Sequence, residues 1–389
     1  MSKTLTVEEV ARQAGVAPQT LRRWRAAGVI HLSDEVWDRG AAGQARMVAR
    51  LRERGHSLRE IREAVASGRL AFGYIQELFP AADDVDLAVA ARRTGLEPEL
   101  IQRIFETIGF GKLDRLRPDD LRFLRDAQAV LDAGFPLPAL LQLTRVYGQA
   151  LAQIADAEVR LFHLYVHEPL MRDGVDGLEI AERMTTLAGQ MLPFATPLMQ
   201  HVHQRFLQHF IEQDVVGHME ADFDAAADLG RLRVAIAFAD LAGFTRLTEE
   251  QGDEEAVNAI ERFVAAVETT LPDDARVIKT IGDEVMVVGT DVGALADWAV
   301  GFQVLYRERP LPRIGLHAGE VVYRDGDYYG REVNLAARVA ARAGAGEVLV
   351  TREVVGAAGP ELAFERIGEV RLKGFAAPTE LFAAARADG

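Results

Sequence analysis

The sequence predicts a multidomain protein with an all-α N-terminal half and an α+β C-terminal domain. Its 389 residues are more than one hydrophobic core usually serves. Before Gly230 the chain carries the signals of successive helices. After it, the apolar strand RLRVAIAFAD begins an alternation of strands and helices. Together with a repeat near the N-terminus, this pattern predicts domains over residues 1–80, 81–150, 151–229 and 230–389.

The first 80 residues carry the start and stop signals of short helices. Thr6 precedes an amphipathic run and stands three residues before Glu9, which is the spacing of a capping box. Glycine or proline marks several of the other helix ends. The signals predict helices over Val7–Ala14, Gln19–Ala27, Gly43–Arg54 and Leu58–Ala66.

This helical pattern occurs twice along the chain. VARQAGVAPQTL at Val10–Leu21 matches VAARRTGLEPELI at Val89–Ile101. RERGHSLREI at Arg52–Ile61 matches LDAGFPLPAL at Leu131–Leu140. The offsets between the copies are 80 and 79 residues, so the copies stay in register. We therefore expect one helical unit that has been duplicated.

Composition restricts the class of protein. The chain contains no cysteine, which excludes disulfides, thiolate metal sites and cysteine nucleophiles. Its N-terminus shows no apolar signal segment, and no run of about 18 apolar residues occurs. We therefore expect a cytoplasmic protein with no membrane partner. The formal charge is −15, yet residues 1–80 carry 13 Lys and Arg against 9 Asp and Glu, so a basic end precedes an acidic remainder.

Residues 151–229 are expected to be helical, with a bend where Pro193 and Pro197 interrupt the run. Six of the nine histidines of the chain lie in this region: His163, His167, His201, His203, His209 and His218. Histidine titrates near neutral pH, so such a cluster can act as a proton switch. The alternative is that these histidines are surface or capping residues.

Two acidic residues stand where predicted strands end. In RLRVAIAFADLAGFTRL, Asp240 ends the strand, Gly243 allows a turn, and a helix follows Phe244 from Thr245. Free N–H groups at such a helix start suit a phosphate. In ARVIKTIGDEVMVVG, Asp283 sits on the turn that joins two strands. Neighbouring carboxylates repel each other unless a divalent cation lies between them, which predicts a two-metal site for phosphoryl chemistry.

These motifs resemble those of a known family. FADLAGFT and KTIGDE are similar to the two metal motifs of class III adenylate and guanylate cyclases, and RIGLHAGE, DYYGREVNLAARV and GEVRLKG follow in the family's order. The resemblance spans about Leu232 to Phe382. It implies a ferredoxin-like α+β domain and an adenylate cyclase that converts ATP to 3′,5′-cyclic AMP and pyrophosphate. Asp240 and Asp283 would then hold the metal ions, two Mg²⁺ or Mn²⁺ per active site.

The resemblance also implies roles for other residues. Lys279 matches the donor to the adenine ring and Asp327 the acceptor, and guanylate cyclases carry other residue types there. Asn334 matches the residue that orients the ribose. Arg338, four residues on and so on the same helix face, matches the arginine that stabilises charge on the α-phosphate. Further substrate contacts are expected from Gly243, Phe244, Thr245 and Lys373; a surface salt bridge is the alternative for the last.

Catalysis in this family takes place between two chains. The metal-binding aspartates come from one protomer, and the residues that match the adenine, ribose and phosphate contacts come from the other. The resemblance therefore implies a homodimer with two complete sites. The segment GEVVYRDGDYYG is short where many relatives carry a dimerisation arm, and it resembles the reduced-arm subgroup. Dimer contacts are then expected elsewhere in the chain.

The N-terminal segment LTVEEVARQAGVAPQTLRRWRAAGVI resembles the helix-turn-helix of MerR-type regulators, and the second copy would be another MerR-like repeat of winged-helix type. Gln19, Thr20, Arg22 and Arg23 would lie on the recognition helix and contact DNA. The wing segment DEVWDRGAAGQ, however, is acidic where DNA-binding relatives are rich in arginine and tyrosine. The alternative is that both copies serve protein interaction or dimerisation.

The segment from Val85 to about Met219 also resembles the regulatory domain that precedes some bacterial class III cyclases, pH-responsive ones included. We therefore predict an adenylate cyclase regulated by N-terminal helical domains. The alternative is a DNA-binding transcriptional regulator whose cyclase-like domain only senses nucleotide. That alternative predicts a defective site, whereas all six matched residues of the site are present.

Overall fold

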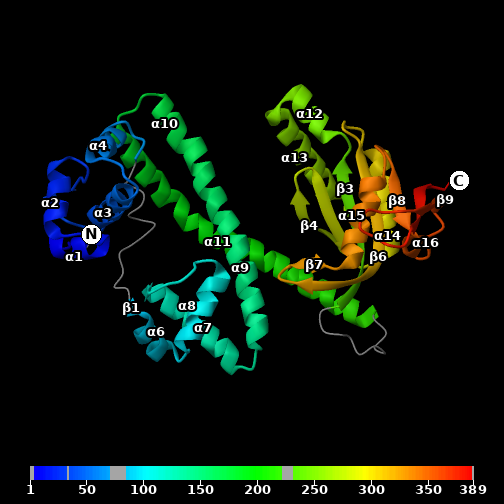
Figure 1. The fold of residues 1–389 in the computed structure, drawn as a ribbon, viewed down its shortest axis with the longest axis horizontal. Coiled ribbons are helices and arrows are strands. Elements are labelled where there is room, and N and C mark those ends of the chain that lie inside the picture. The colour runs from blue at the N-terminus through cyan, green and yellow to red at the C-terminus, as the bar shows by residue number, and fades with distance from the viewer. Residues whose placement is uncertain (1–3, 33–34, 71–84, 221–230, 388–389) are drawn as a thin grey trace. The chain divides into compact units, whose positions relative to one another are not determined.

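The computed structural model describes residues 4–32, 35–70, 85–220 and 231–387. The chain forms two compact units, Met1–Glu212 and Gln213–Gly389, of which the first is helical and the second contains a large sheet (Figure 1). This confirms the helical N-terminal half and the α+β C-terminal domain. The boundary expected at Gly230 lies outside the described residues. No helix in the described ranges is long and apolar enough to cross a membrane.

In its described ranges, the first unit consists of helices and one small two-stranded ladder, and its last helix continues past the boundary at Glu212. Its elements are α1 (Val7–Ala14), α2 (Pro18–Ala26), α3 (Arg39–Glu53), α4 (Leu58–Ala66), β1 (Val85–Asp86), α6 (Leu87–Thr94), α7 (Pro98–Ile108), β2 (Arg115–Leu116), α8 (Pro118–Asp132), α9 (Leu137–Phe162), the π-helical turn η2 (His163–His167), α10 (Glu168–Arg172) and α11 (Gly177–Glu220).

Local capping explains where the N-terminal helices begin. The N–H of Glu9 donates to Thr6 Oγ1 at 3.1 Å, and the N–H of Thr6 donates to Glu9 Oε2 at 2.6 Å, which completes the predicted capping box of α1. Helix α3 begins at Arg39, earlier than the expected Gly43, because Asp38 Oδ1 accepts from the N–H of Ala41 at 2.9 Å and caps the helix there.

The sequence repeat is also a structural repeat. Helices α1 to α4 and α6 to α9 follow the same order, and Gly15 and Gly95 both end the first helix in the left-handed conformation, with φ of 68° and 80°. The N–H of Leu5 donates to the carbonyl of Trp37 at 2.7 Å, and β1 pairs with β2 at the matching place in the second copy. Each copy encloses its own apolar core.

The bend expected at Pro193 and Pro197 does not interrupt the helix, since both prolines lie inside α11. A proline removes one N–H donor from the helix and crowds the preceding turn, but it leaves the hydrogen bonds of the other turns in place. The prediction of a break here was therefore wrong.

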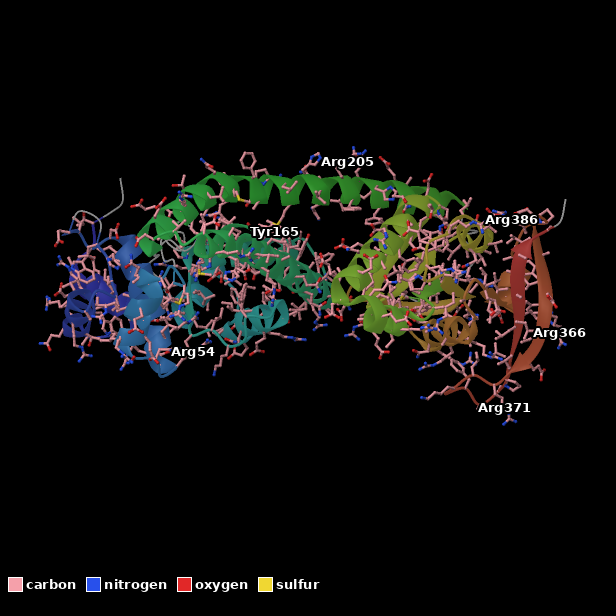
Figure 2. The ribbon with its side chains drawn as sticks, turned by 90° about the horizontal axis from the view of Figure 1, so that it is seen from above. Arg54, Tyr165, Arg205, Arg366, Arg371 and Arg386 are labelled. Carbon is pink, nitrogen blue, oxygen red and sulfur yellow. The ribbon has the colours of Figure 1, made fainter. Side chains whose placement is uncertain are left out.

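The second unit is built on one sheet with the strand order β4-β5-β3-β6-β8-β10-β9, and β7 pairs with β6. Its elements are β3 (Arg231–Leu241), α12 (Phe244–Gln251), α13 (Asp253–Thr270), β4 (Ala275–Ile281), β5 (Glu284–Gly289), α14 (Val292–Leu305), β6 (Pro312–Arg324), β7 (Asp327–Tyr329), α15 (Arg331–Arg342), β8 (Val348–Thr351), α16 (Arg352–Val355), β9 (Leu362–Val370) and β10 (Thr379–Arg386). Figure 2 shows Arg366, Arg371 and Arg386 at the end of the unit formed by β9 and β10.

Strand β3 is buried on both faces. Ala235 and Ala237 face a core to which α13 and α14 contribute, whereas Ile236 and Phe238 face α15. Strand β6 approaches α15 most closely at Gly315, where a Cβ atom would lie 2.0 Å from the backbone nitrogen of Ala340. Only glycine therefore lets the helix lie this close to the sheet.

This close approach makes a prediction about stability. We expect Gly315→Ala to lower the free energy of unfolding by about 3 kcal/mol, because the added methyl group forces α15 away from the sheet. Gly356→Ala is the matched control: its Cβ would meet no atom closer than 3.7 Å, and its φ of −71° suits alanine. Scanning calorimetry of the full chain measures both variants. Equal unfolding temperatures for the two would contradict the packing described here.

Candidate active site

Two aspartates meet at one end of the sheet. Asp240 lies near the end of β3, directly opposite Glu284 on β5 and Arg313 on β6. Asp283 lies in the tight turn between β4 and β5, where Gly282 has a φ of 65° that favours glycine. Because β3 and β5 are neighbours, the turn places Asp283 beside Asp240, as the two sequence motifs predict.

The electrostatics of this cluster are dominated by its acids. Burial raises the pKa of Asp283 to about 7, aided by the hydrogen bond with Asp240 and by the charge of Asp240. Burial, followed by the charge of Asp240, also raises the pKa of Glu284. Arg313 opposes these effects: its Nε donates to Asp240 Oδ2 at 2.7 Å, and its Nη2 donates to the same oxygen. The cluster therefore attracts further positive charge.

The donor set fits a hard divalent cation. Carboxylate oxygens are the preferred ligands of Mg²⁺ and Mn²⁺. Within the described ranges, no group of three or more His, Cys, Asp or Glu side chains is arranged to hold an ion. Two carboxylates suit a site at which substrate phosphates and water supply the remaining ligands, which is how proteins commonly bind Mg²⁺.

Lys279 and Asp327 come together from distant strands. Lys279 Nζ donates to Asp327 Oδ2, and the two side chains are 36% and 23% exposed. A turn in which Asp325 and Gly326 have φ of 53° and 81° reverses the chain into β7 and so brings Asp327 opposite β6. Asp327 Oδ1 also accepts from the N–H of Tyr328 at 2.8 Å. A cationic donor and an anionic acceptor thus stand side by side, reachable from solvent.

Asn334 and Arg338 lie on the exposed side of α15. The opposite side of this helix is buried against the sheet: Leu335, Ala336, Val339 and Ala340. The charge of Arg338 lowers the pKa of Glu284, partly offsetting the rise caused by burial and by Asp240. Arg338 therefore acts electrostatically on the carboxylate cluster of its own chain.

The segment after β3 forms a glycine turn followed by a helix. Gly243 has a φ of 86° and precedes α12, which begins at Phe244, one residue earlier than expected, and Thr245 is exposed in the first turn. No side chain caps this helix, so its first N–H groups are open to an anion. Lys373 is exposed in a turn that Gly374 closes with a φ of 90°.

The N-terminal candidates lie on α2. Gln19, Arg22 and Arg23 are exposed there, and Thr20 is half-buried. Arg22 Nη2 lies 3.4 Å from Glu8 Oε1. This surface is thus partly neutralised by an acid of α1.

The five candidate histidines with described side chains do not form one cluster. His163 and His167 lie in η2 with their Nδ1 atoms 3.0 Å apart, and Nε2 of the buried His167 lies 2.6 Å from the carbonyl of Gly68. The other candidates on α11 with described side chains are exposed and lie elsewhere: His201, His203 and His209. The side chain of His218 lies outside the described residues.

Two residues of the carboxylate cluster were missed from the sequence, Arg313 and Glu284. Both stand in quoted motifs, since Arg313 opens RIGLHAGE and Glu284 closes KTIGDE. Their positions beside Asp240 depend on the register of β6 and β5 against β3, which the motifs do not specify.

Comparison with known proteins gives matches along most of the chain. Residues 29–211 match the family described as adenylate cyclase regulatory domain, and residues 231–383 match the adenylate and guanylate cyclase catalytic domain. The pH-sensitive adenylate cyclase MT1302 of Mycobacterium tuberculosis is 30% identical over 378 residues, which cover 92% of this chain and 92% of that protein. An adenylate cyclase of Streptomyces coelicolor is 31% identical over 273 residues, covering 67% and 68%.

Among solved structures, the adenylyl cyclase CyaB from P. aeruginosa is 22% identical, with a TM-score of 0.37, and the match covers 41% of this chain and 96% of that chain.

The raised pKa of Asp283 predicts how pH and cations change stability. The folded chain keeps this proton up to about pH 7, whereas an unfolded carboxyl loses it near pH 4. Stability is therefore lost as pH rises from about 4 to about 7, and the loss persists above that range. We expect Asp283→Asn to raise the melting temperature, and to raise it more at pH 8 than at pH 5.

Mn²⁺ should raise the melting temperature of the wild type at pH 8, because the ion relieves the repulsion between the carboxylates, but not that of Asp283→Asn. Glu268→Gln, an exposed acid on α13, is the control and should respond like the wild type. A thermal shift with Mn²⁺ that is the same in Asp283→Asn and the wild type would exclude Asp283 as a ligand.

Proposed function

The chain belongs to the adenylate and guanylate cyclase family and is an adenylate cyclase, and we propose that it works with two divalent cations held by Asp240 and Asp283 between two copies of the chain. The observation that carries this proposal is the contact between these two carboxylates at the sheet end. Membership of the family, together with the adenylate cyclases among the relatives, identifies the substrate as ATP and the products as cyclic AMP and pyrophosphate.

Other residues of the site bind and orient the substrate in this proposal. Lys279 donates to the adenine ring and Asp327 accepts from its amino group, so that adenine inserts between two groups that now bond each other. Asn334 orients the ribose. The first N–H groups after Gly243, at Phe244 and Thr245, meet the phosphates, and Lys373 reaches the terminal ones.

The chemical step needs charge neutralisation at the α-phosphate and removal of the ribose 3′ proton. Bound at Asp240 and Asp283, divalent cations would lower the pKa of the attacking hydroxyl and neutralise the triphosphate. Arg338 donates to the α-phosphate as its negative charge grows, which a fixed guanidinium does well in a site of low water content. Arg313 retains a hydrogen bond to Asp240 and keeps that carboxylate aimed at the edge of the sheet.

Helix α11 and the turn η2 support association with a second copy. Large apolar side chains are exposed along α11, among them Phe194 (73%), Leu198 (62%) and Phe206 (57%). Figure 2 shows side chains that project from α11, on which Arg205 is labelled. The label of Tyr165 shows where η2 follows α9. Tyr165 is itself 72% exposed. Exposed apolar rows of this kind mark interfaces. In this proposal they supply the dimer contacts that the short segment between β6 and β7 leads us to expect elsewhere in the chain.

Complementation tests the assignment of the site to two chains. Asp240→Ala and Arg338→Ala should each abolish cyclic AMP formation alone. Mixed after subunit exchange, they should recover about a quarter of wild-type activity, because half of the dimers then contain one intact site. Mixing two separate preparations of Asp240→Ala is the control. Failure of the mixed variants to regain activity would place all of the site residues in one chain.

For the N-terminal helices we propose protein interaction or dimerisation rather than DNA binding. Arg22 pairs with Glu8, and Arg25 pairs with Glu35, so two arginines of α2 are already engaged by acids. A surface that binds DNA needs free cations for the phosphates.

We also propose that pH regulates the enzyme through His163 and His167. In the neutral pair, Nε2–H of His167 donates to the carbonyl of Gly68, and Nδ1 of His167 accepts from His163. A proton on both Nδ1 atoms would oppose two N–H groups across 3.0 Å. Among the described residues, the acid that pairs with His163 is Glu168, whose Oε1 lies 3.5 Å from His163 Nε2. Acidification should therefore weaken the contact between His163 and His167, which holds the His167 ring beside Gly68.

Substitution by glutamine tests this proton switch. His167→Gln keeps a donor near the carbonyl of Gly68 but does not titrate, so we expect a flatter activity profile between about pH 5 and 8 than in the wild type. His201→Gln, exposed on α11, should keep the wild-type profile. Cyclic AMP formation by the full chain is the measurement. A wild-type profile in His167→Gln would exclude the switch.

A further inference from the structure

Alternate residues of β6 make one continuous row beneath α15. Arg313 bonds Asp240, and Gly315 lies under the backbone of Ala340. His317 is next in this row, and Gly319 follows it. The period of two places all four on the same face of the strand. The motif RIGLHAGE thus runs from the carboxylate cluster to the beginning of α15, and the proposed function leaves His317 without a role.

His317 is held by hydrogen-bonding groups from two other elements. Its side chain is 4% exposed, and its Nε2 lies 2.6 Å from Glu332 Oε2 in the first turn of α15. Its Nδ1 lies 2.8 Å from Thr351 Oγ1 at the end of β8. Because a carboxylate only accepts, Nε2 carries the proton and donates it to Glu332. The hydroxyl of Thr351 can either donate to Nδ1 or accept from it.

The chain makes room for this contact. A Cβ atom at Gly319 would lie 2.8 Å from Glu332 Cγ and 3.1 Å from His317 Nε2, so any larger residue would push the two side chains apart. Helix α15 also lacks an ordinary cap, since Gly330 precedes it with no side chain to bond its first N–H groups. In the absence of a side-chain cap, the hydrogen bond from His317 to Glu332 holds the first turn of α15 against the sheet.

That first turn leads directly to the catalytic residues of the proposed function. Asn334 is two residues beyond Glu332, and Arg338 is one helical turn further on. The far half of α15 is fixed by the close contact at Gly315. In the near half, Leu335 and Ala336 are buried, and Glu332 adds a polar anchor at the first turn. A loss of this anchor would leave the helix packed but would let Asn334 move.

We propose that His317 is a positioning residue for cyclic AMP formation: by holding Glu332 it fixes the first turn of α15 and so the place of Asn334. The proposal rests on the proposed function of Asn334. Besides Glu332, the acid nearest to the imidazole is Glu353, whose Oε2 lies 3.6 Å from Nδ1. Arg331 Nη1 lies 3.1 Å from Glu332 Oε1 and belongs to the same group of charges.

Two amide substitutions distinguish the role of Nε2 of His317 from that of Nδ1. Glutamine places its amide nitrogen near the position of Nε2, and asparagine reaches only the position of Nδ1. We expect His317→Asn to lower kcat by about 10- to 100-fold, because small displacements of catalytic groups have effects of this size. KM for ATP should stay within about threefold, and His317→Gln should remain within about threefold of the wild type in both constants. Steady-state assays of the full chain with ATP and Mn²⁺ measure both constants.

Coupling to Asn334 distinguishes positioning from general stability. In an Asn334→Ala background, His317→Asn should cost much less than it does alone, because the group that it positions is gone. Glu332→Gln keeps the shape of the side chain that accepts from His317 but makes it a weaker acceptor. If His317→Asn does not fold, the kcat of Glu332→Gln tests the positioning role instead. Wild-type kcat in a folded His317→Asn or Glu332→Gln, or equal losses with and without Asn334, would overturn the inference. A wild type that makes no cyclic AMP would instead overturn the proposed function.

Discussion

Asp240 and Asp283 touch at the end of the sheet, and the repulsion between them constrains everything around the site. Two partly buried carboxylates in contact need positive charge nearby. The fold supplies one such charge from Arg313, which lies opposite Asp240 because β3 and β6 pair along their length. In the proposed function, a divalent cation supplies more positive charge and brings the phosphates of ATP with it. The chemistry of the site thus follows from an electrostatic cost that the backbone imposes.

Strand β6 links the carboxylates of Asp240 and Asp283 to the helix that carries Asn334 and Arg338. One face of the strand carries an arginine for the aspartate, a glycine that admits α15, and the histidine that bonds Glu332. The same short segment therefore sets the position of Asp240, the acid proposed to bind metal, and the position of the helix with Asn334 and Arg338. Helix α15 and the sheet end are adjusted to each other through β6, so changes at either one should be felt at the other.

Much of this arrangement could be predicted from local sequence, because caps, turns and strand ends are local. The capping box at Thr6, the duplication and the meeting of Asp240 with Asp283 belong here. What could not be predicted depends on register and packing. The contact between Arg313 and Asp240 follows from the register of β6 against β3, which the sequence motifs do not specify. The run of histidines suggested one cluster. Among the described side chains only His163 and His167 come together, whereas His201, His203 and His209 are exposed on α11.

Counting bound Mn²⁺ tests whether the aspartate pair is a two-metal site for ATP. Electron paramagnetic resonance of the full chain with a non-cyclising ATP analogue should show two ions per active site, and Asp240→Asn with Asp283→Asn should show none above the analogue alone. Retention of both ions by the double variant, or binding of the analogue without any ion in the wild type, would contradict the account.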